Sequence, residues 1–258
     1  MTDDLTVWWD ADAEGPENMA ADEALAAEAV RRGGPVARFY GWREPTLSLG
    51  AFQPLAGARA IAPHAVVRRP SGGGAILHGT DLTYAAAVPR DHPLGRAARP
   101  LYDLWHVALV EELAARGLAA RLCGAAEVAA CPDDEAFLCF ARRADGDVVM
   151  PPAARPARPD DPKILGSAQR RLAGAVVQHG SLLLRASPAA EGLVGLEDLS
   201  PASAPVAVAD LAPRWAARVA AALGGRVVTP EGDFRSAHAA VFAAAVRRHG
   251  DPSWLGRR

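Results

Sequence analysis

Short apolar segments alternate with longer amphipathic segments along the chain, and this pattern predicts both strands and helices. Helical spacing of apolar residues predicts helices at 18–32, 101–116, 206–223 and 234–249, with Asn18 as the N-cap of the first. Apolar runs bounded by glycine, proline or charged residues predict strands at 36–42, 46–49, 66–69, 75–77, 81–88, 148–149, 163–165, 175–177 and 181–184. A polar turn is expected between the strands at 163–165 and 175–177. Because no regular strand–helix–strand repeat is present, we expect an α/β protein of the α+β type, with a mixed β-sheet flanked by helices.

Proline is concentrated in one segment, at 151–161, where it excludes both helix and central strand. This segment is therefore expected to be an exposed loop. It lies too close to the neighbouring strands to separate two domains, so we expect a single domain over 1–258. The segment after about residue 193 is expected to be a helical C-terminal extension.

Composition and charge narrow the class of protein. The chain has 258 residues, of which 50% are hydrophobic and 22% charged, which is typical of a soluble globular protein. A net charge of −2 indicates no nucleic-acid partner. No apolar stretch reaches the ~20 residues of a membrane helix, and the acidic N-terminus lacks the apolar region of a signal peptide. We therefore expect a cytoplasmic monomer without membrane contact.

The three cysteines, Cys123, Cys131 and Cys139, form no CxxC pair, which argues against a disulfide framework and against a metal site. The basic residues are also unusual, because Lys163 is the only lysine among 28 lysines and arginines. Lysine is a compact cation whose pKa responds to its surroundings, whereas arginine is a wide fork that stays charged. Lys163 is therefore a candidate functional residue, although a single lysine can also be a surface residue.

A glycine-rich segment follows the predicted strand at 66–69 and reads Arg69-Pro70-Ser71-Gly72-Gly73-Gly74-Ala75, with His78 shortly after it. Consecutive glycines let a ligand approach bare main chain and let backbone N–H groups point inward. The segment has neither the GK[ST] of a P-loop nor the GxGxxG spacing of a dinucleotide site. As an isolated pattern it is equally typical of a hairpin turn.

Two further segments contain candidate chemistry. The first reads KILGSAQRR at 163–171 and is followed by QHGS at 178–181; the second is Cys139 within the apolar run Phe137-Leu138-Cys139-Phe140. A buried cysteine is more often an inert packing residue than a nucleophile, and the histidines His78 and His179 are more often structural than catalytic.

Taken together, the segments RRPSGGGAILH, KILGSAQRR and QHGSLLL resemble the lipoate–protein ligase and octanoyltransferase family, whose catalytic domain is shared with biotin–protein ligases. RFYGWREPTLSLGAFQ and DLTYAAAVP are similar to the flanking segments of that family, so the resemblance covers roughly residues 5–190. It implies the mixed-sheet fold of that catalytic domain, with an acyl tunnel under the glycine-rich loop. It also implies attachment of an octanoyl or lipoyl chain to one lysine of a lipoyl domain or of the glycine-cleavage H protein.

The family contains two chemistries. Octanoyltransferases take the octanoyl group from acyl carrier protein through a cysteine thioester and need no cofactor, whereas ligases activate lipoate with ATP and Mg²⁺. Cys139-Phe140, upstream of Lys163, is similar to the Cys-Phe pair of one bacterial octanoyltransferase group. The chain departs from that group at 141–143, in the proline-rich segment and at Gly74. An octanoyltransferase is the leading hypothesis; an ATP-dependent ligase and a non-catalytic acyl- or carrier-binding module are the alternatives.

The hypothesis assigns a role to each candidate residue. Cys139 is the nucleophile, and Lys163 raises the thiolate fraction and binds the developing oxyanion. The remaining candidates are expected to bind the acyl group or line the site: Arg69, Ser71, Gly72, Gly73, Gly74, Ala75, His78, Gly166, Ser167, Ala168, Gln169 and His179. Cys123 and Cys131 are expected to be packing residues.

Overall fold

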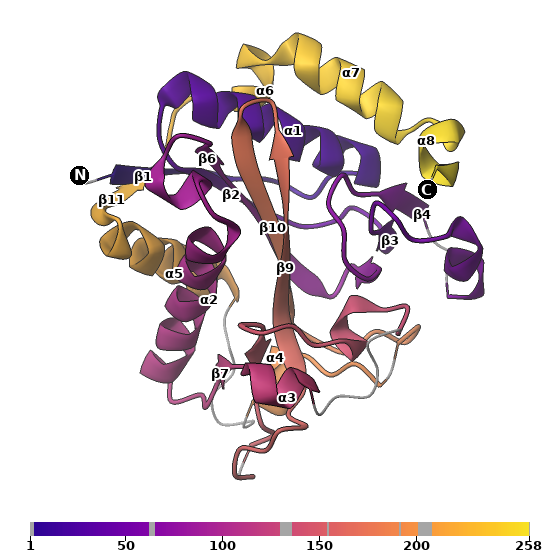
Figure 1. Cartoon of the computed structure of the whole chain (residues 1–258), viewed down its shortest axis with the longest axis vertical. Helices are drawn as coiled ribbons and strands as arrows, with labels where there is room; N and C mark the ends of the chain where they lie inside the picture. Colours follow the sequence, from indigo (N-terminus) through magenta and orange to yellow (C-terminus); the bar gives the residue numbers. More distant parts are fainter. Residues whose placement is uncertain are drawn as a thin grey trace.

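An eight-stranded mixed sheet crosses the centre of the molecule (Figure 1). The structure is a computed structural model and describes residues 3–61, 65–129, 136–153, 155–190, 192–200 and 208–257. The strand order is β11-β1-β2-β6-β10-β9-β8-β7. The strands are β1 (Asp3–Trp9), β2 (Val36–Tyr40), β6 (Asp81–Pro89), β7 (Arg121–Leu122), β8 (Val148–Val149), β9 (Lys163–Leu172), β10 (Ala175–Leu183) and β11 (Gly224–Val228).

Alternation along the central strands divides the core into two layers, one on each face of this sheet. Tyr84, Ala86 and Val88 of β6 face the cluster under α2 (Ala98–Ala115) and α5 (Val208–Ala222). Ala85 and Ala87 face α1 (Gly15–Arg32), along which α7 (Ala239–His249) packs on the outside (Figure 1). The mixed sheet flanked by helices confirms the expected fold class.

A second, three-stranded sheet carries the glycine-rich loop. Its order is β4-β3-β5, with β3 (Thr46–Leu49) parallel to β4 (Ala65–Arg68) and antiparallel to β5 (Ile76–His78). The loop at 69–75 connects β4 to β5. The remaining short elements are η1 (Leu55–Ala60), η2 (Pro93–Gly95), α3 (Ala125–Ala129), η3 (Cys139–Ala141), α4 (Leu196–Leu199), α6 (Phe234–Ala237) and α8 (Pro252–Gly256).

Helix α1 begins earlier than the sequence pattern indicated. Its N-cap is Glu14, whose backbone N–H donates to the Glu17 side chain at 3.1 Å, and a proline occupies its first turn. Asn18 is therefore not the cap but a fully buried side chain inside the helix, where it donates to the Gly41 carbonyl at 3.0 Å. An asparagine near a helix start is ambiguous, because both roles satisfy its side chain with backbone groups.

The strands β9 and β10 form one long hairpin, closed by Ala173 and Gly174 with positive φ angles of 48° and 85°. The expected polar turn at 166–174 was wrong, because 166–172 belongs to β9. Arginines at 170 and 171 lie on its exposed end, where a strand needs no apolar side chains. The second half of β9 was therefore not predicted as a strand, because its exposed end has a polar sequence.

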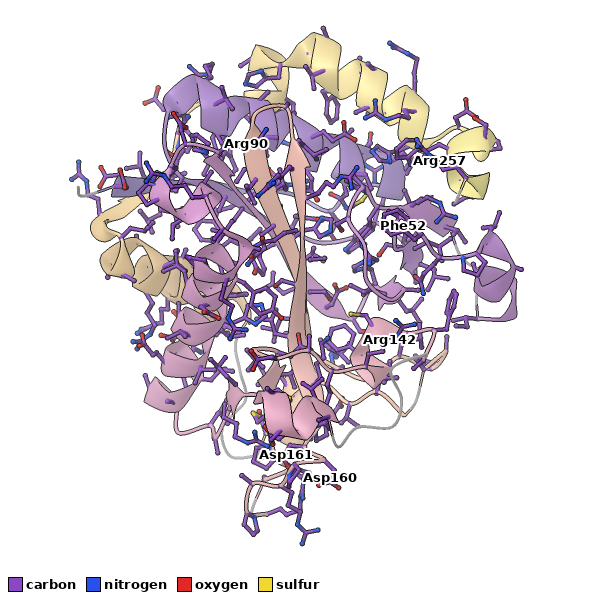
Figure 2. All side chains as sticks on the ribbon, viewed as in Figure 1. Phe52, Arg90, Arg142, Asp160, Asp161 and Arg257 are labelled. Atoms are coloured by element: carbon purple, nitrogen blue, oxygen red, sulfur yellow. The ribbon has the colours of Figure 1, made fainter. Side chains whose placement is uncertain are left out.

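The C-terminal region was expected to be helical, but it also contains a strand. Strand β11 pairs in parallel with β1 at the edge of the main sheet, which its glycine-containing sequence did not predict. In the proline-rich segment, the described residues form neither helix nor strand, and Asp160 and Asp161 lie at the end of the molecule opposite α7 (Figure 2). Within the described residues, no helix combines the length and apolarity needed to cross a membrane.

Candidate active site

The thiol of Cys139 and the ammonium of Lys163 lie together. Lys163 Nζ is 3.6 Å from Cys139 Sγ and 3.4 Å from the Cys139 carbonyl oxygen. Lys163 is the first residue of β9 and Cys139 the first of η3, where its backbone N–H donates to the Ala75 carbonyl at 2.7 Å. A Cβ at Gly74 would lie 2.9 Å from the Cys139 backbone. The close approach of the loop to the cysteine therefore requires glycine at position 74.

Asp147 holds the ammonium of Lys163 in place. Asp147 Oδ2 is 2.8 Å from Lys163 Nζ, and both side chains are buried. The Tyr102 hydroxyl donates to Asp147 Oδ1 at 2.7 Å and the Ala144 N–H donates to Oδ2 at 2.6 Å, which fixes the carboxylate. Burial lowers the pKa of Lys163, but the negative charges of Cys139 and Asp147 more than offset this, so the pKa is raised above its ordinary value. Lys163 is therefore a cation at neutral pH.

Gly166 makes room for this lysine. A Cβ at position 166 would lie 2.4 Å from Lys163 Cε and 2.6 Å from Nζ, far inside contact distance. Gly166 lies within β9 and not in a turn, and its missing side chain leaves the space that the ammonium occupies.

Arg69 stabilises the glycine-rich loop by hydrogen bonds to its carbonyl oxygens. Its Nη1 donates to the carbonyl and hydroxyl oxygens of Ser48 at 2.6 and 2.7 Å, and its Nη2 donates to the carbonyls of Gly72 and Gly74 at 3.2 and 2.8 Å. Gly73 has a φ of 92°, which favours glycine. Arg69 is 3% exposed, and its Nε has no hydrogen-bond partner among the described residues. One guanidinium thus holds the loop that continues to Gly74 and Ala75.

His179 connects the loop to α1. Its Nε2 makes a short hydrogen bond with Ser71 Oγ, and its Nδ1 lies 3.1 Å from Asp22 Oδ2. Asp22 is fully buried and is paired with Arg38 at 2.8 Å. The result is a buried Ser–His–Asp arrangement between the loop, β10 and α1.

His78 has a similar arrangement on β5. Its Nε2 lies 2.7 Å from Ser48 Oγ and its Nδ1 2.8 Å from Asp81 Oδ2. Burial lowers the pKa of His78 below its ordinary value despite the opposing effect of Asp81. The ring is therefore neutral at pH 7, so Nδ1–H donates to Asp81 and Nε2 accepts from Ser48. Both nitrogens are occupied within the protein, as in a structural histidine.

The space under the loop is smaller than the acyl tunnel that the resemblance implies. The cavity there has a volume of about 10 Å³, enough for one water molecule at most. Next to it, Cys139 packs on an apolar wall of Ile76, Phe140, Leu183 and Leu193. The cavity is lined by Met19, Tyr40, Trp42, Arg69, Ile76, His78, Thr83, His179, Gly180 and Ser181. An octanoyl chain fits only after these side chains or the loop move apart.

Ser167 and Gln169 point away from His179, to the face of the sheet that α2 covers. Ser167 Oγ is 2.7 Å from His106 Nε2 and 2.8 Å from the Tyr84 hydroxyl, while Gln169 donates to Gln178 at 2.7 Å. The main chain of Ala168 pairs with His179 in the β9–β10 hairpin. Ser167 and Gln169 therefore lie away from the cavity under the loop, whereas Ala168 shares the face of the sheet on which His179 lines that cavity.

Sequence reasoning missed the carboxylates of this site. Asp147 lies beside the Asp145-Gly146 turn, and a search for the counter-ion of the sole lysine would have found it. Asp22 and Tyr102 give no local signal in the sequence, because each is one of several polar residues within its helix.

The other two cysteines were expected to be packing residues. Cys123 is buried, as a packing residue should be, and Cys131 lies outside the described residues. No three acidic, histidine or cysteine side chains of the described chain are arranged to hold a metal ion.

Comparison with known proteins matches these features to one family. The family model described as the lipoyl protein ligase A/B catalytic domain matches residues 14–205. The chain is 35% identical over 179 residues to the octanoyltransferase LipM of Symbiobacterium thermophilum, which is 66% of this chain and 61% of that protein. It is 32% identical over 179 residues to the octanoyltransferase LipM of Bacillus subtilis, covering 65% and 60% of the two chains. The match thus spans about three fifths of the length of these relatives.

Solved structures share the fold at lower sequence identity. A bipartite lipoate protein ligase from Thermoplasma acidophilum has a TM-score of 0.67 and 17% identity, over 99% of this chain and 97% of that one. The lipoate-protein ligase A bound with ATP has a TM-score of 0.66 and 18% identity, over 99% and 98%. These likenesses confirm the fold that the sequence motifs implied.

Proposed function

The chain belongs to the lipoyl protein ligase A/B catalytic-domain family, and from this premise we propose that it is an octanoyltransferase of protein lipoylation. The donor is octanoyl–acyl carrier protein, and the octanoyl group passes through a thioester on Cys139. The acceptor is a lysine of a lipoyl domain or of the glycine-cleavage H protein. The similarity to octanoyltransferases supports the reaction, and a related T. acidophilum ligase is described together with an E2 lipoyl domain, which supports that class of acceptor.

The observation that carries the proposal is the contact between Cys139 and Lys163. A protonated lysine 3.6 Å from the sulfur places positive charge beside the atom that attacks and beside the oxyanion that forms. In the first step the thiolate attacks the octanoyl carbonyl, a new C–S bond forms, the C–S bond of the donor breaks, and the donor sulfur leaves as a thiolate that takes a proton from water. Exchange of one thioester for another is nearly neutral in free energy, so this step needs no nucleotide.

In the second step the acceptor amine attacks the Cys139 thioester, the amide forms, and the cysteine leaves as thiolate. The amine loses a proton, which Lys163 cannot accept because its raised pKa keeps it protonated. The proton passes to water, because both ring nitrogens of His179, like those of His78, are already bonded within the protein. Lys163 instead stabilises the oxyanion of both tetrahedral intermediates.

The octanoyl chain would occupy the space under the loop after the small cavity opens. Burying its methylenes yields ~0.8 kcal/mol each, or roughly 5 kcal/mol for the chain. This gain favours an eight-carbon chain over short acyl groups.

Intact-protein mass spectrometry tests the proposal. The purified chain is mixed with octanoyl–acyl carrier protein without ATP, and an octanoyl adduct is expected. The adduct should be absent in Cys139→Ala and retained in the matched variant Cys123→Ala. Cys123 is a suitable control because it is buried, and burial raises the pKa of its thiol.

The ligase alternative gives a different result. No adduct would form with the acyl carrier donor, and a lipoyl domain would be modified only after addition of lipoate, ATP and Mg²⁺. An adduct that persists in Cys139→Ala would contradict the assigned nucleophile while leaving acyl transfer in place.

A further inference from the structure

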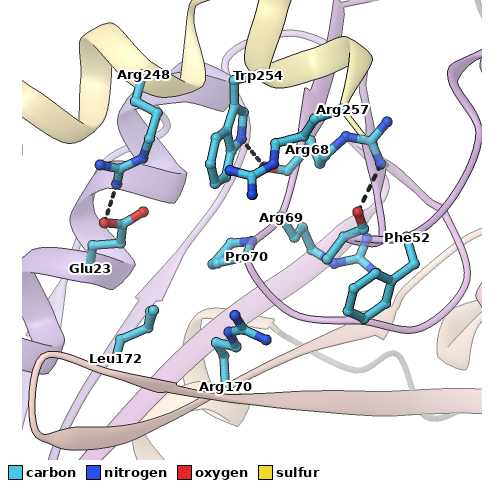
Figure 3. Close-up of a pocket in the computed structure, with 11 residues that line it drawn as sticks. Glu23, Phe52, Arg68, Arg69, Pro70, Arg170, Leu172, Arg248, Trp254 and Arg257 are labelled. Atoms are coloured by element: carbon cyan, nitrogen blue, oxygen red, sulfur yellow. Dashed lines mark hydrogen bonds and ion pairs between the residues drawn. The ribbon is translucent and has the colours of Figure 1, made fainter.

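A second pocket, of about 390 Å³, lies on the outer side of the glycine-rich loop and has no role in the mechanism above (Figure 3). It lies where the end of β4, the exposed end of β9 and the C-terminal helices α7 and α8 meet. Helices α7 and α8 follow residue 205, so this wall lies outside the segment that matches the family model. The pocket is lined by Glu23, Ala51, Phe52, Arg68, Arg69, Pro70, Arg170, Leu172, Arg248, Trp254 and Arg257.

The pocket carries a large excess of positive charge. Five arginines line it, against one glutamate. That glutamate, Glu23, is already ion-paired with Arg248 and with His249. Burial lowers the pKa of Arg68, and the like charge of Arg257 lowers it further. Repulsion between cations is thus built into the pocket, and an anion bound there would relieve it.

Two of these arginines are available to a ligand. Arg68 is committed to the main chain, since it donates to the carbonyls of Gly50 and Leu255 at 2.9 and 2.7 Å. The side chains of Arg170 and Arg257 are exposed, and neither donates a hydrogen bond within the described part of the chain. Arg257 lies over the Trp254 ring at 4.5 Å, which orients it along the pocket wall.

The pocket and the Cys139 thiol lie at opposite ends of the same short loop. Arg69 and Pro70 line the pocket, while Gly74 lies against the Cys139 backbone. Arg69 itself bridges this interval, because its Nη2 donates to the Gly74 carbonyl at 2.8 Å. Five loop residues span at most ~18 Å, which sets an upper limit on the distance between this wall of the pocket and the Cys139 backbone.

We propose that this pocket binds the phosphate of the phosphopantetheine arm that carries the octanoyl thioester. The inference rests on the proposed function, which requires such an arm to deliver its carbonyl to Cys139. About thirteen bonds separate phosphorus from sulfur in the arm, which at three bonds per residue gives an extended reach of ~15 Å. This reach is close to the upper limit that the loop sets, so an arm held at the pocket is long enough to approach the thiol. Guanidinium forks bind phosphate oxygens in paired hydrogen bonds, and Arg170 and Arg257 provide two such forks.

Three small thioesters distinguish the sources of phosphate. Octanoyl-pantetheine has none, octanoyl-phosphopantetheine has the arm phosphate, and octanoyl-coenzyme A adds a nucleotide. Loading of Cys139 is followed by intact mass for each donor. The phosphorylated arm is expected to load about tenfold faster than octanoyl-pantetheine at low salt, and coenzyme A no faster than the phosphorylated arm.

Variants of Arg170 and Arg257 test whether the preference for the phosphorylated donor arises in this pocket. Arg170→Gln with Arg257→Gln should remove the tenfold preference while octanoyl-pantetheine loads at an unchanged rate. Arg247→Gln, an exposed arginine of α7 outside the pocket, should retain the preference.

Equal loading by the first two thioesters in the wild type would overturn the inference, as would a preference that survives the double variant. Faster loading by coenzyme A would also overturn it and assign the pocket to a nucleotide. If octanoyl–acyl carrier protein loads Cys139 but no small thioester does, the carrier surface rather than the arm is recognised, and the inference fails alone. If no donor loads Cys139, the proposed function itself has failed.

Discussion

Replacing Gly166 with alanine tests the role of the lysine without removing any charge. The added methyl would lie 2.4 Å from Lys163 Cε and 2.6 Å from Nζ, whereas ordinary contacts begin near 3.4 Å. The ammonium must therefore move by about 1 Å. If it retreats from 3.6 to ~4.6 Å from the sulfur, the Coulomb attraction at an effective dielectric constant of ~20 weakens by ~1 kcal/mol. A loss of that size corresponds to an about fivefold lower rate for a reaction in which the sulfur attacks as an anion.

The rate of alkylation of Cys139 by iodoacetamide at pH 7 measures this change, with peptide mass mapping to identify the modified cysteine. Gly166→Ala is expected to react about fivefold more slowly, and octanoyl loading should slow by the same factor. Gly34→Ala is the matched control, because its Cβ would have no neighbour within 4 Å. A Gly166→Ala variant that folds normally and reacts at the wild-type rate would refute the assignment of thiol activation to Lys163.

Three further variants test the electrostatics of the site and of the core. Lys163→Arg keeps the charge but places a wider fork in the space bounded by Gly166 and Asp147, so octanoyl loading should fall at least about tenfold; wild-type loading would show that charge alone suffices. Arg38→Met removes the fully buried partner of Asp22, so urea denaturation should show a loss of ~3–5 kcal/mol, and a loss below ~1 kcal/mol would contradict this. Burial holds the pKa of His106 at about 4, below its ordinary value of 6.5. Between pH 6.5 and pH 4, His106 is therefore protonated in the unfolded chain but neutral in the folded chain. The free energy of unfolding should fall by up to ~3 kcal/mol as the pH drops from 6.5 to 4. The slope of urea-derived stability against pH should be shallower in His106→Gln, and an unchanged slope would exclude His106 as its source.

The sequence predicted those elements well whose structure depends only on residues close together in the chain. The glycine-rich loop, the neighbouring strands and the amphipathic α2 all depend on residues a few positions apart, and they are found near their predicted places. The pairing of Cys139 with Lys163 was also within reach, because family motifs placed both residues in one site.

Long-range partners were not within reach of the same reasoning. Asp147 and Asp22 reach their partners only through the folded arrangement of η3, β9, β10 and α1. Strand β11 exists because β1 offers it an unpaired edge, more than two hundred residues away in the chain. The boundary of α1 was misread since the same residue type satisfies a helix end and a buried position equally well.

The isolation of Lys163 has a chemical consequence for the proposed acyl transfer. Acyl thioesters react with accessible lysine amines, including those of the protein that carries them. This chain has no lysine other than Lys163, and that residue is 6% exposed, with its ammonium paired to a carboxylate. Its side chains therefore offer no nucleophilic amine at neutral pH, so the proposed thioester chemistry at Cys139 would not be diverted into an amide on the protein's own lysine.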